Sequence, residues 1–132
     1  MPLFPNARID TYLSAAGENE ETRLKETLER ASVYEETGAE GVFVPGVVEP
    51  ATVRKPAAGI ALPLNVMAGP GAPTVAEPGA PGAARVGVGS GIGQAAHALV
   101  RAAARELLTT GTYGTPADGL AHGELNTLLG RD

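Results

Sequence analysis

The sequence contains no cysteine and no tryptophan, and only 4% of its 132 residues are aromatic. The absence of cysteine excludes disulfides, zinc–thiolate sites and thiol nucleophiles. With so few aromatic rings, a core must be built from Ala, Val, Leu and Ile, which dominate the 43% of residues that are hydrophobic. The length is that of one domain or of part of a larger one, and we expect residues 1–132 to form a single domain.

The chain also lacks a basic run and a long apolar run. Its 10 Lys and Arg residues are outnumbered by 15 Asp and Glu residues, for a net charge of -5 at pH 7. That balance argues against a surface for nucleic acid or for an acidic membrane. No apolar run approaches the roughly 18 residues of a membrane span, and MPLFPNARID does not resemble a signal peptide. We therefore expect a soluble, cytoplasmic protein with neither nucleic-acid nor membrane partners.

Glycine and proline are abundant, at 18 and 11 residues, and much of the excess falls between Pro45 and Gly93. They punctuate short apolar runs, which predict strands in 41–45, at the start of 62–73 and in 84–91. A further strand is predicted at the N-terminus, where Asn6, Arg8 and Asp10 alternate.

Helical patterns follow these strands. Periodic apolar residues predict helices over 18–38, 92–111 and 122–129. The segment 50–59 begins as a helix, and we expect Pro56 to interrupt it. The segment 74–83 falls where another helix is expected, yet it carries Pro78 and Pro81.

Short buried strands that alternate with helices are typical of parallel β/α units. Four such units make half of a (β/α)8 barrel, which needs about 250 residues when complete. An open doubly wound sheet is the rival architecture. The barrel is favoured because each strand ends in a polar or glycine-rich turn.

In parallel barrels, ligands bind at the C-terminal ends of the strands, which draws attention to Arg8, Asp10 and Asn65. Arg8 is either a bidentate clamp for a carboxylate or phosphoryl group, or a structural residue paired with Asp10 at the rim. Asn65 interrupts an apolar strand. It is either a hydrogen-bonding substrate contact or a buried amide that ties down neighbouring backbone.

The run 87-GVGSGIG-93 resembles a phosphate-binding loop but lacks the required third glycine, because Ile92 takes its place. Gly89 and Ser90 at a helix N-terminus can hold an anion through backbone N–H groups. They equally fit an ordinary turn in which Ser90 is the N-cap. His97 and His122 have no partner at metal-ligand spacing, so we expect no metal site.

Several segments resemble one family. NARIDTYL, GAEGVFVPG, LPLNVMAGPGAPTVAE, RVGVGSG, AARELLTTGTY and ELNTLL are similar to the second half of the isocitrate lyase/phosphoenolpyruvate mutase superfamily. The nearest branches are the phosphoenolpyruvate phosphonomutase-like and carboxyvinyl-carboxyphosphonate phosphorylmutase-like proteins. The resemblance implies the C-terminal half of a (β/α)8 barrel that uses Mg²⁺. It also implies action on C–C or P–C bonds of small α-oxo or α-hydroxy carboxylates, through an enolate-like pyruvate species.

The same resemblance assigns roles to individual residues. Arg8 aligns with the arginine that binds the substrate's anionic group in the motif A-R-T-D, and Asn65 with a polar substrate contact on the seventh strand. Asp10 would orient Arg8, with Gly89 and Ser90 as supporting residues. Ile9 replaces the usual threonine of that motif, and 43-FVPG-46 lacks the acid of many lyases. No catalytic residue is assigned.

The family's metal-binding aspartates and catalytic lid belong to the first half of the barrel, which this sequence does not contain. We therefore expect this chain alone to hold no Mg²⁺ and to be inactive, although it resembles a lyase or mutase. The alternative is a non-catalytic truncated remnant or a self-associating half-barrel. Expected partners are a small carboxylate or phosphonate substrate, and either a second copy of the chain or a complementing N-terminal half.

Overall fold

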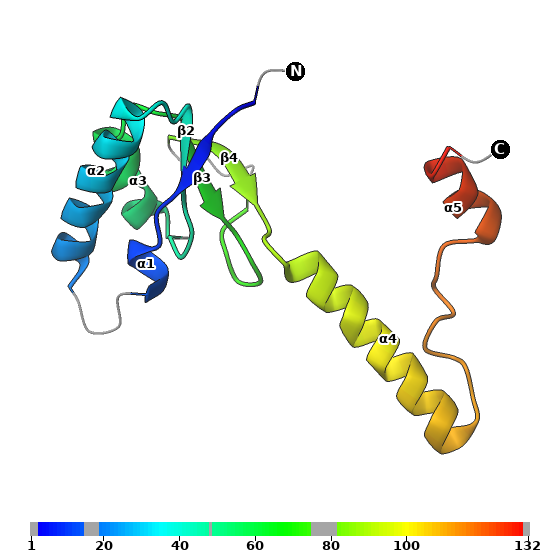
Figure 1. Cartoon of the computed structure of the whole chain (residues 1–132). Helices are drawn as coiled ribbons and strands as arrows, with labels where there is room; N and C mark the ends of the chain where they lie inside the picture. Colours follow the sequence, from blue (N-terminus) through cyan, green and yellow to red (C-terminus); the bar gives the residue numbers. More distant parts are fainter. Residues whose placement is uncertain (1–2, 15–18, 48, 75–81, 131–132) are drawn as a thin grey trace. The chain divides into compact units, whose positions relative to one another are not determined.

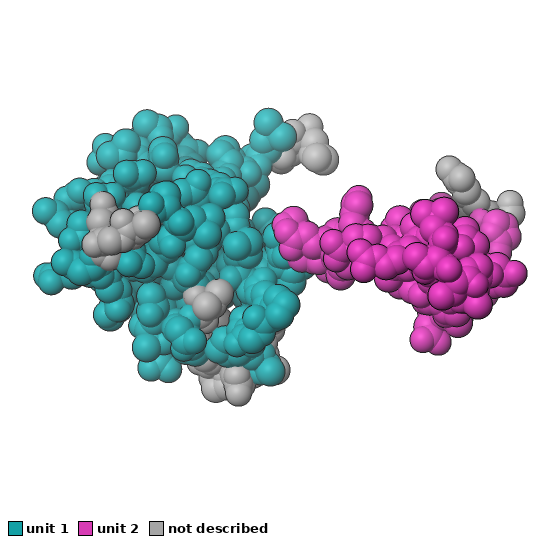
Figure 2. Space-filling view, turned by 90° about the horizontal axis from the view of Figure 1, so that it is seen from below, with its two compact units in different colours: residues 1–89 teal, residues 90–132 magenta. Residues whose placement is uncertain are grey.

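A computed structural model describes residues 3–14, 19–47, 49–74 and 82–130 (Figure 1). The chain divides into two compact units, residues 1–89 and 90–132, coloured separately in Figure 2. Unit 1 contains the β-sheet, and unit 2 contains two helices. None of the helices within the described ranges is long and apolar enough to cross a membrane.

Unit 1 is built on a four-stranded sheet whose strands lie in chain order. The strands are β1 (Asn6–Arg8), β2 (Gly41–Val44), β3 (Leu64–Met67) and β4 (Ala83–Gly87). Each pairs with its neighbour in parallel, and the register shifts by one residue between β3 and β4 at Leu64/Asn65. The prediction of four parallel strands is confirmed.

Three helices accompany this sheet: α1 (Thr11–Ser14), α2 (Glu20–Glu36) and α3 (Pro50–Gly59). Helix α2 begins where Asn19 accepts a hydrogen bond from the Thr22 amide at 2.9 Å, so one of the free N–H groups of the first turn is capped. It ends before Gly38, whose φ of +95° suits glycine. The helix predicted over 18–38 is thus confirmed, except that Glu18 lies outside the described residues.

The core lies on the side of the sheet where α2 and α3 are found (Figure 1). Alternate residues of the two central strands point into it, because a strand has a side-chain period of two. Its buried members come from the strands, the helices and the loops: Val42, Val44, Leu64, Val66, Ala31, Val53, Ile9, Val47 and Ile60. As the composition predicts, this core contains no aromatic residue that is fully buried.

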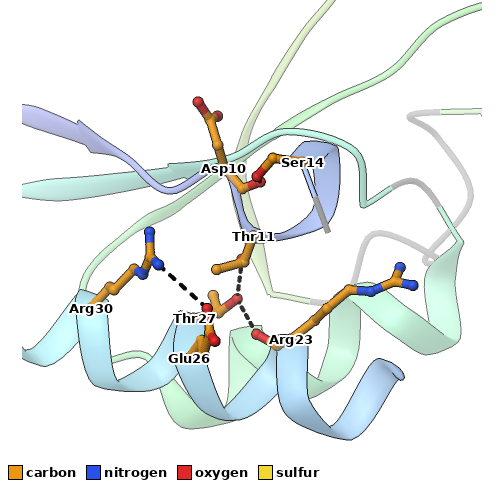
Figure 3. A network of polar contacts seen from close by, with 7 residues as sticks. All are labelled: Asp10, Thr11, Ser14, Arg23, Glu26, Thr27 and Arg30. Atoms are coloured by element: carbon orange, nitrogen blue, oxygen red, sulfur yellow. Dashed lines mark hydrogen bonds and ion pairs between the residues drawn. The ribbon is translucent and has the colours of Figure 1, made fainter. Parts of the chain in front are cut away.

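A buried pair of hydroxyl groups joins α1 to α2 (Figure 3). Thr11 and Thr27 lie 2.6 Å apart through their Oγ1 atoms, and Thr27 Oγ1 also donates to the Arg23 carbonyl at 2.7 Å. Since a hydroxyl has one proton, Thr11 is the donor to Thr27. The periodic apolar pattern of α2 does not reveal this polar contact, although Thr27 is fully buried.

The expectation that Pro56 interrupts the helix at 50–59 is wrong. Helix α3 runs through Pro56 to Gly59, and the Pro56 carbonyl accepts a hydrogen bond from Ile60 N at 2.9 Å. The missing N–H costs a backbone hydrogen bond, but the ring is fully buried in the core, which offsets that cost. Pro78 and Pro81, and with them most of the segment 74–83, lie outside the described residues.

Unit 2 consists of α4 (Gly91–Thr110), α5 (His122–Leu128) and the loop between them. The helices predicted over 92–111 and 122–129 are confirmed. The loop is anchored by Glu106, whose carboxylate accepts hydrogen bonds from Thr112 Oγ1, Gly114 N and Thr115 N, each at 2.7 Å. No described residue of this unit is buried.

Candidate functional site

The strand register aligns four side chains in one row across the sheet. Arg8 pairs with Phe43, Phe43 with Asn65, and Asn65 with Arg85. Their strand neighbours such as Val42 point into the core on the helix side, so the row occupies the opposite face. In a (β/α)8 barrel, the face turned away from the helices is the one that lines the interior.

Arg8 lies over the ring of Phe43, with Cζ 5.8 Å from the ring centroid. Its Nε donates to Asp10 Oδ1 at 2.6 Å, and the two side chains are 56% and 46% exposed. Ion pairs this exposed contribute about 0–1 kcal/mol to stability. Since Nε is only one of five N–H donors of a guanidinium, the pair with Asp10 orients Arg8 and leaves its terminal nitrogens for an anion.

The chain turns sharply after β1, so that the side chains of Asp10 and Thr11 point in different directions. In Figure 3 the Asp10 carboxylate points away from α2, while the next side chain, Thr11, points toward Thr27. The turn is held because the Asp10 carbonyl accepts hydrogen bonds from the amides of Leu13 and Ser14, both at 3.0 Å. The backbone at β1 therefore directs Asp10 to the side that also carries Arg8.

Asn65 is 7% exposed, and its Oδ1 has no hydrogen-bond partner in the described part of the chain. An unpaired buried acceptor costs about 1–3 kcal/mol. A residue that only tied down neighbouring backbone would use this atom for it. The geometry thus weakens the purely structural interpretation of Asn65 and points to a donor that arrives with a ligand or from a neighbouring side chain.

A hollow of about 330 Å³ lies beyond the C-terminal ends of β2 and β3. Its lining is mostly small and apolar: Gly46, Met67, Ala68, Gly69, Pro70, Gly71 and Ala72. Gly46 has a φ of +90°, and a Cβ placed there would lie 2.9 Å from the Tyr12 carbonyl oxygen. Only glycine allows the loop after β2 to approach α1 this closely.

A second hollow of about 380 Å³ borders the same glycine and is more polar. It is lined by Tyr12, Glu20, Arg23, Gly46, Val47, Glu49 and Thr52. Burial raises the pKa of the Tyr12 hydroxyl, and the nearby Glu20 carboxylate raises it further. Tyr12 therefore stays a neutral phenol at physiological pH.

The two predicted supporting residues, Gly89 and Ser90, lie at the junction between β4 and α4. Gly89 has a φ of +53°, which favours glycine, and a Cβ there would lie 2.7 Å from Met67 Sδ, beside the first hollow. Ser90 occupies the N-cap position of α4 but makes no side-chain capping hydrogen bond. It belongs to unit 2, whereas the row belongs to unit 1.

Arg85 is the member of the row that sequence reasoning missed. A signal was present, since Arg85 is a charged residue inside the apolar strand run that ends at Gly87, as Asn65 is in its own strand. Its neighbourhood depends on the pairing of β3 with β4 and on the register shift at Leu64/Asn65. Neither can be read from residue spacing.

The described residues do not fit a Mg²⁺ site of their own. No group of three or more His, Asp or Glu side chains within these ranges is arranged to hold a metal ion. Asp10, the acidic residue beside Arg8, is paired with the Arg8 guanidinium.

Comparisons with known proteins place the chain in one group. The family model for phosphoenolpyruvate phosphomutase matches residues 1–108. The uncharacterised proteins MT2054 and Rv1998c, from two strains of Mycobacterium tuberculosis, are each 38% identical over 101 residues. That alignment covers 73% of this chain and 37% of each relative, so the chain spans little more than a third of their length.

Two solved structures from Burkholderia cenocepacia J2315 are similar in fold. One, assigned as a phosphonomutase, is 39% identical with a TM-score of 0.70, over 77% of this chain and 41% of that one. The other, assigned as a lyase/mutase, is 23% identical with a TM-score of 0.78, over 98% of this chain and 46% of that one. The parallel sheet corresponds to part of a (β/α)8 barrel, and the chain belongs to the phosphoenolpyruvate phosphomutase family.

Proposed function

We propose that this chain forms the anion-binding part of a lyase or mutase site for C–C or P–C bonds of a small α-oxo or α-hydroxy carboxylate. The observation that carries the proposal is the row on the sheet, in which Arg8 and Asn65 share one face and flank Phe43. A cation and an amide at the same level of a barrel interior suit a small acid.

Each member of the row has a distinct part in this proposal. The terminal nitrogens of Arg8 donate hydrogen bonds to a carboxylate or phosphonate in a bidentate manner, and Asp10 holds the guanidinium in orientation through Nε. Phe43 supplies an apolar floor that excludes water on one side of the ligand and packs against the Arg8 cation. Asn65 fixes the orientation of the acid through its amide.

We include Mg²⁺ in this proposal because the resemblance to the family implies it. When bound, such an ion stabilises the negative charge of an enolate-like species. Since the described residues contain no cluster that fits it, we propose that its ligands come from outside this chain. On that basis, the isolated chain binds the acid without turning it over.

Calorimetric titration with pyruvate tests the binding function. Replacing Arg8→Met is expected to weaken pyruvate binding by about tenfold or more, because it removes a charge-assisted bidentate contact. Arg54→Met is the matched control, since Arg54 is an exposed arginine of α3 on the helix side. Equal affinities of the two variants would refute the proposal.

A parallel titration with Mg²⁺ tests the proposed dependence on outside ligands. We expect no saturable heat for the isolated chain, with or without pyruvate. Binding at micromolar Mg²⁺, or conversion of an α-oxo or α-hydroxy acid by the chain alone, would show that the chain is active without complementation.

The alternative of self-association is favoured by a specific observation. Strands β1 and β4 are the two outer strands of the sheet, and outer strands present unpaired N–H and C=O groups to another chain. We propose that a second copy, or a complementing N-terminal half, covers these edges. Sedimentation that shows a monomer at high concentration, with no association with that half, would argue against this.

A further inference from the structure

The turn after β1 holds Asp10 between two anchored residues. On one side, Ile9 is 1% exposed, and its amide donates a hydrogen bond to the Phe43 carbonyl at 2.8 Å. On the other side, Thr11 is buried and reaches Thr27 through its hydroxyl group. The Asp10 side chain itself is 46% exposed. The direction of its carboxylate is therefore set by the backbone between the two anchors.

The anchor on the Thr11 side is a chain of two hydrogen bonds (Figure 3). Thr11 Oγ1 donates to Thr27 Oγ1 at 2.6 Å, and Thr27 Oγ1 donates to the Arg23 carbonyl at 2.7 Å. Apolar contact is non-directional, whereas a hydrogen bond weakens steeply as its angle departs from linear. A valine at position 27 would have the right shape for this buried site, but it would not fix the direction of Thr11.

Helix α1 carries this constraint to the Asp10 backbone. The Asp10 carbonyl accepts hydrogen bonds from the amides of Leu13 and Ser14, and also from Ser14 Oγ at 2.8 Å. A shift of α1 relative to α2 would therefore also turn the Asp10 peptide. Since Thr11 begins α1 and Thr27 lies in α2, their hydroxyl pair determines how the two helices are placed.

We propose that Thr27 is a positioning residue for the anion site. It acts through Thr11 on the backbone of Asp10, and the Asp10 carboxylate then passes this orientation to Arg8 Nε, 2.6 Å away. The inference rests on the proposed function of Arg8. It adds that a buried hydroxyl group on α2, which touches neither Arg8 nor a ligand, sets how tightly the acid is bound.

Calorimetric titration of the full chain with pyruvate tests the effect on binding. Thr27→Val is expected to weaken pyruvate binding by about three- to tenfold, as for members of one hydrogen-bond network. Thr27→Ser keeps the hydroxyl group, so it is expected to bind within about twofold of the unaltered chain. Val53→Ala, at a buried residue of α3, is the control, because it lowers stability without removing a hydroxyl group.

A double-mutant cycle tests the route through Asp10. Asp10→Ala removes the carboxylate that orients Arg8, so adding Thr27→Val to it is expected to cause no further loss of pyruvate affinity. An equal loss in both backgrounds would show that Thr27 acts by another route, and would overturn the inference.

The Nε–H resonance of Arg8 in a ¹H–¹⁵N spectrum gives a measurement that needs no ligand. In Thr27→Val it is expected to move toward its position in Asp10→Ala, and in Thr27→Ser and Val53→Ala to stay in place. If Thr27→Val lowers the melting temperature but changes neither this resonance nor the pyruvate affinity, Thr27 is only structural and the inference is refuted, while the proposed function stands.

Failure of the proposed function would look different. If the unaltered chain binds no pyruvate, the proposed function is refuted whatever the variants do. Movement of the Arg8 resonance in Thr27→Val would then still support orientation of Arg8 by Thr27, and its absence would refute that orientation too.

Discussion

The two units of this chain are stabilised by different interactions. Unit 1 encloses a core of strand, helix and loop residues in which Leu64 is 2% exposed. In unit 2 no described residue is buried, and large apolar side chains such as Leu107 remain 55% exposed. One unit is stabilised by removing apolar surface from water, and the other by local hydrogen bonds within helices and their loop.

The difference shows what the apolar pattern of α4 means. Its 20 residues carry leucines and a valine whose side chains stay exposed within the described structure, among them Leu99, Val100 and Leu108. Isolated helices gain little stability from propensity alone, and most of it comes from packing an apolar face. Unit 2 therefore leaves exposed an apolar helix surface of the kind that α2 and α3 bury in the core of unit 1.

The largest expected effect separates the two units directly. Leu64→Ala is expected to lower the free energy of unfolding by about 2–5 kcal/mol, because it leaves a cavity in the core. Leu107→Ala is expected to lower it by less than about 0.5 kcal/mol, as for other exposed positions. Urea denaturation monitored by circular dichroism measures both.

The same pair of variants can also show that the two units are not stabilised differently in solution. If the cost of Leu107→Ala equals that of Leu64→Ala and grows with protein concentration, the apolar surface of α4 is covered by a second copy in solution. In that case unit 2 is stabilised by burial as unit 1 is, but between chains.

A smaller effect is expected at the loops of unit 1. Gly46 and Gly71 have similar φ values of +90° and +87°, but a Cβ would lie 2.9 Å from backbone at Gly46 and meet nothing within 4 Å at Gly71. Gly71→Ala is expected to cost about 1 kcal/mol for the left-handed backbone alone, and Gly46→Ala about 1–2 kcal/mol more for the steric clash. Equal losses of stability in thermal unfolding would show that the loop after β2 moves aside.

The smallest effect is local to unit 2 and depends on pH. Hydrogen bonds from Thr115, Thr112 and the Gly114 amide lower the pKa of Glu106 from 4.5 to about 2. Because the folded-state pKa is depressed, the stabilisation is complete above about pH 4.5 and is lost as the pH falls toward 2. The amide resonances of Gly114 and Thr115 should report this titration.

Two variants sharpen that measurement. Glu106→Gln is expected to shift both amide resonances already at neutral pH and to abolish their titration near pH 2. Glu124→Gln, on α5 in the same unit, should leave them unchanged. A titration midpoint near 4.5 in the unaltered chain would mean that the loop is not anchored in solution.

Sequence patterns predicted the architecture well because apolar period and turn residues determine it locally. The runs at 41–45 and 62–73 became β2 and β3, and the alternation around Arg8 became β1. Pro56 was misjudged because helix propensity considers the lost N–H and not the burial of the ring. That burial depends on tertiary packing.

The site was predicted less completely. Arg8 and Asn65 were singled out because polar residues stand out in short apolar strands, and the register aligns them on one face. Arg85 was missed, since its place depends on which strand pairs with β4 and on a shift in that pairing. The binding role of Arg8 remains a prediction that the pyruvate titration tests, and the roles of Asn65 and Asp10 remain predictions.

The chain-order arrangement of the four strands has a consequence for how such barrels can be assembled. Each of the four described strands pairs with the next one along the chain, so the first and last strands each have one open flank. Further β/α modules can join at either flank without rethreading those already in place. The complementation proposed above would therefore need only docking of the two parts.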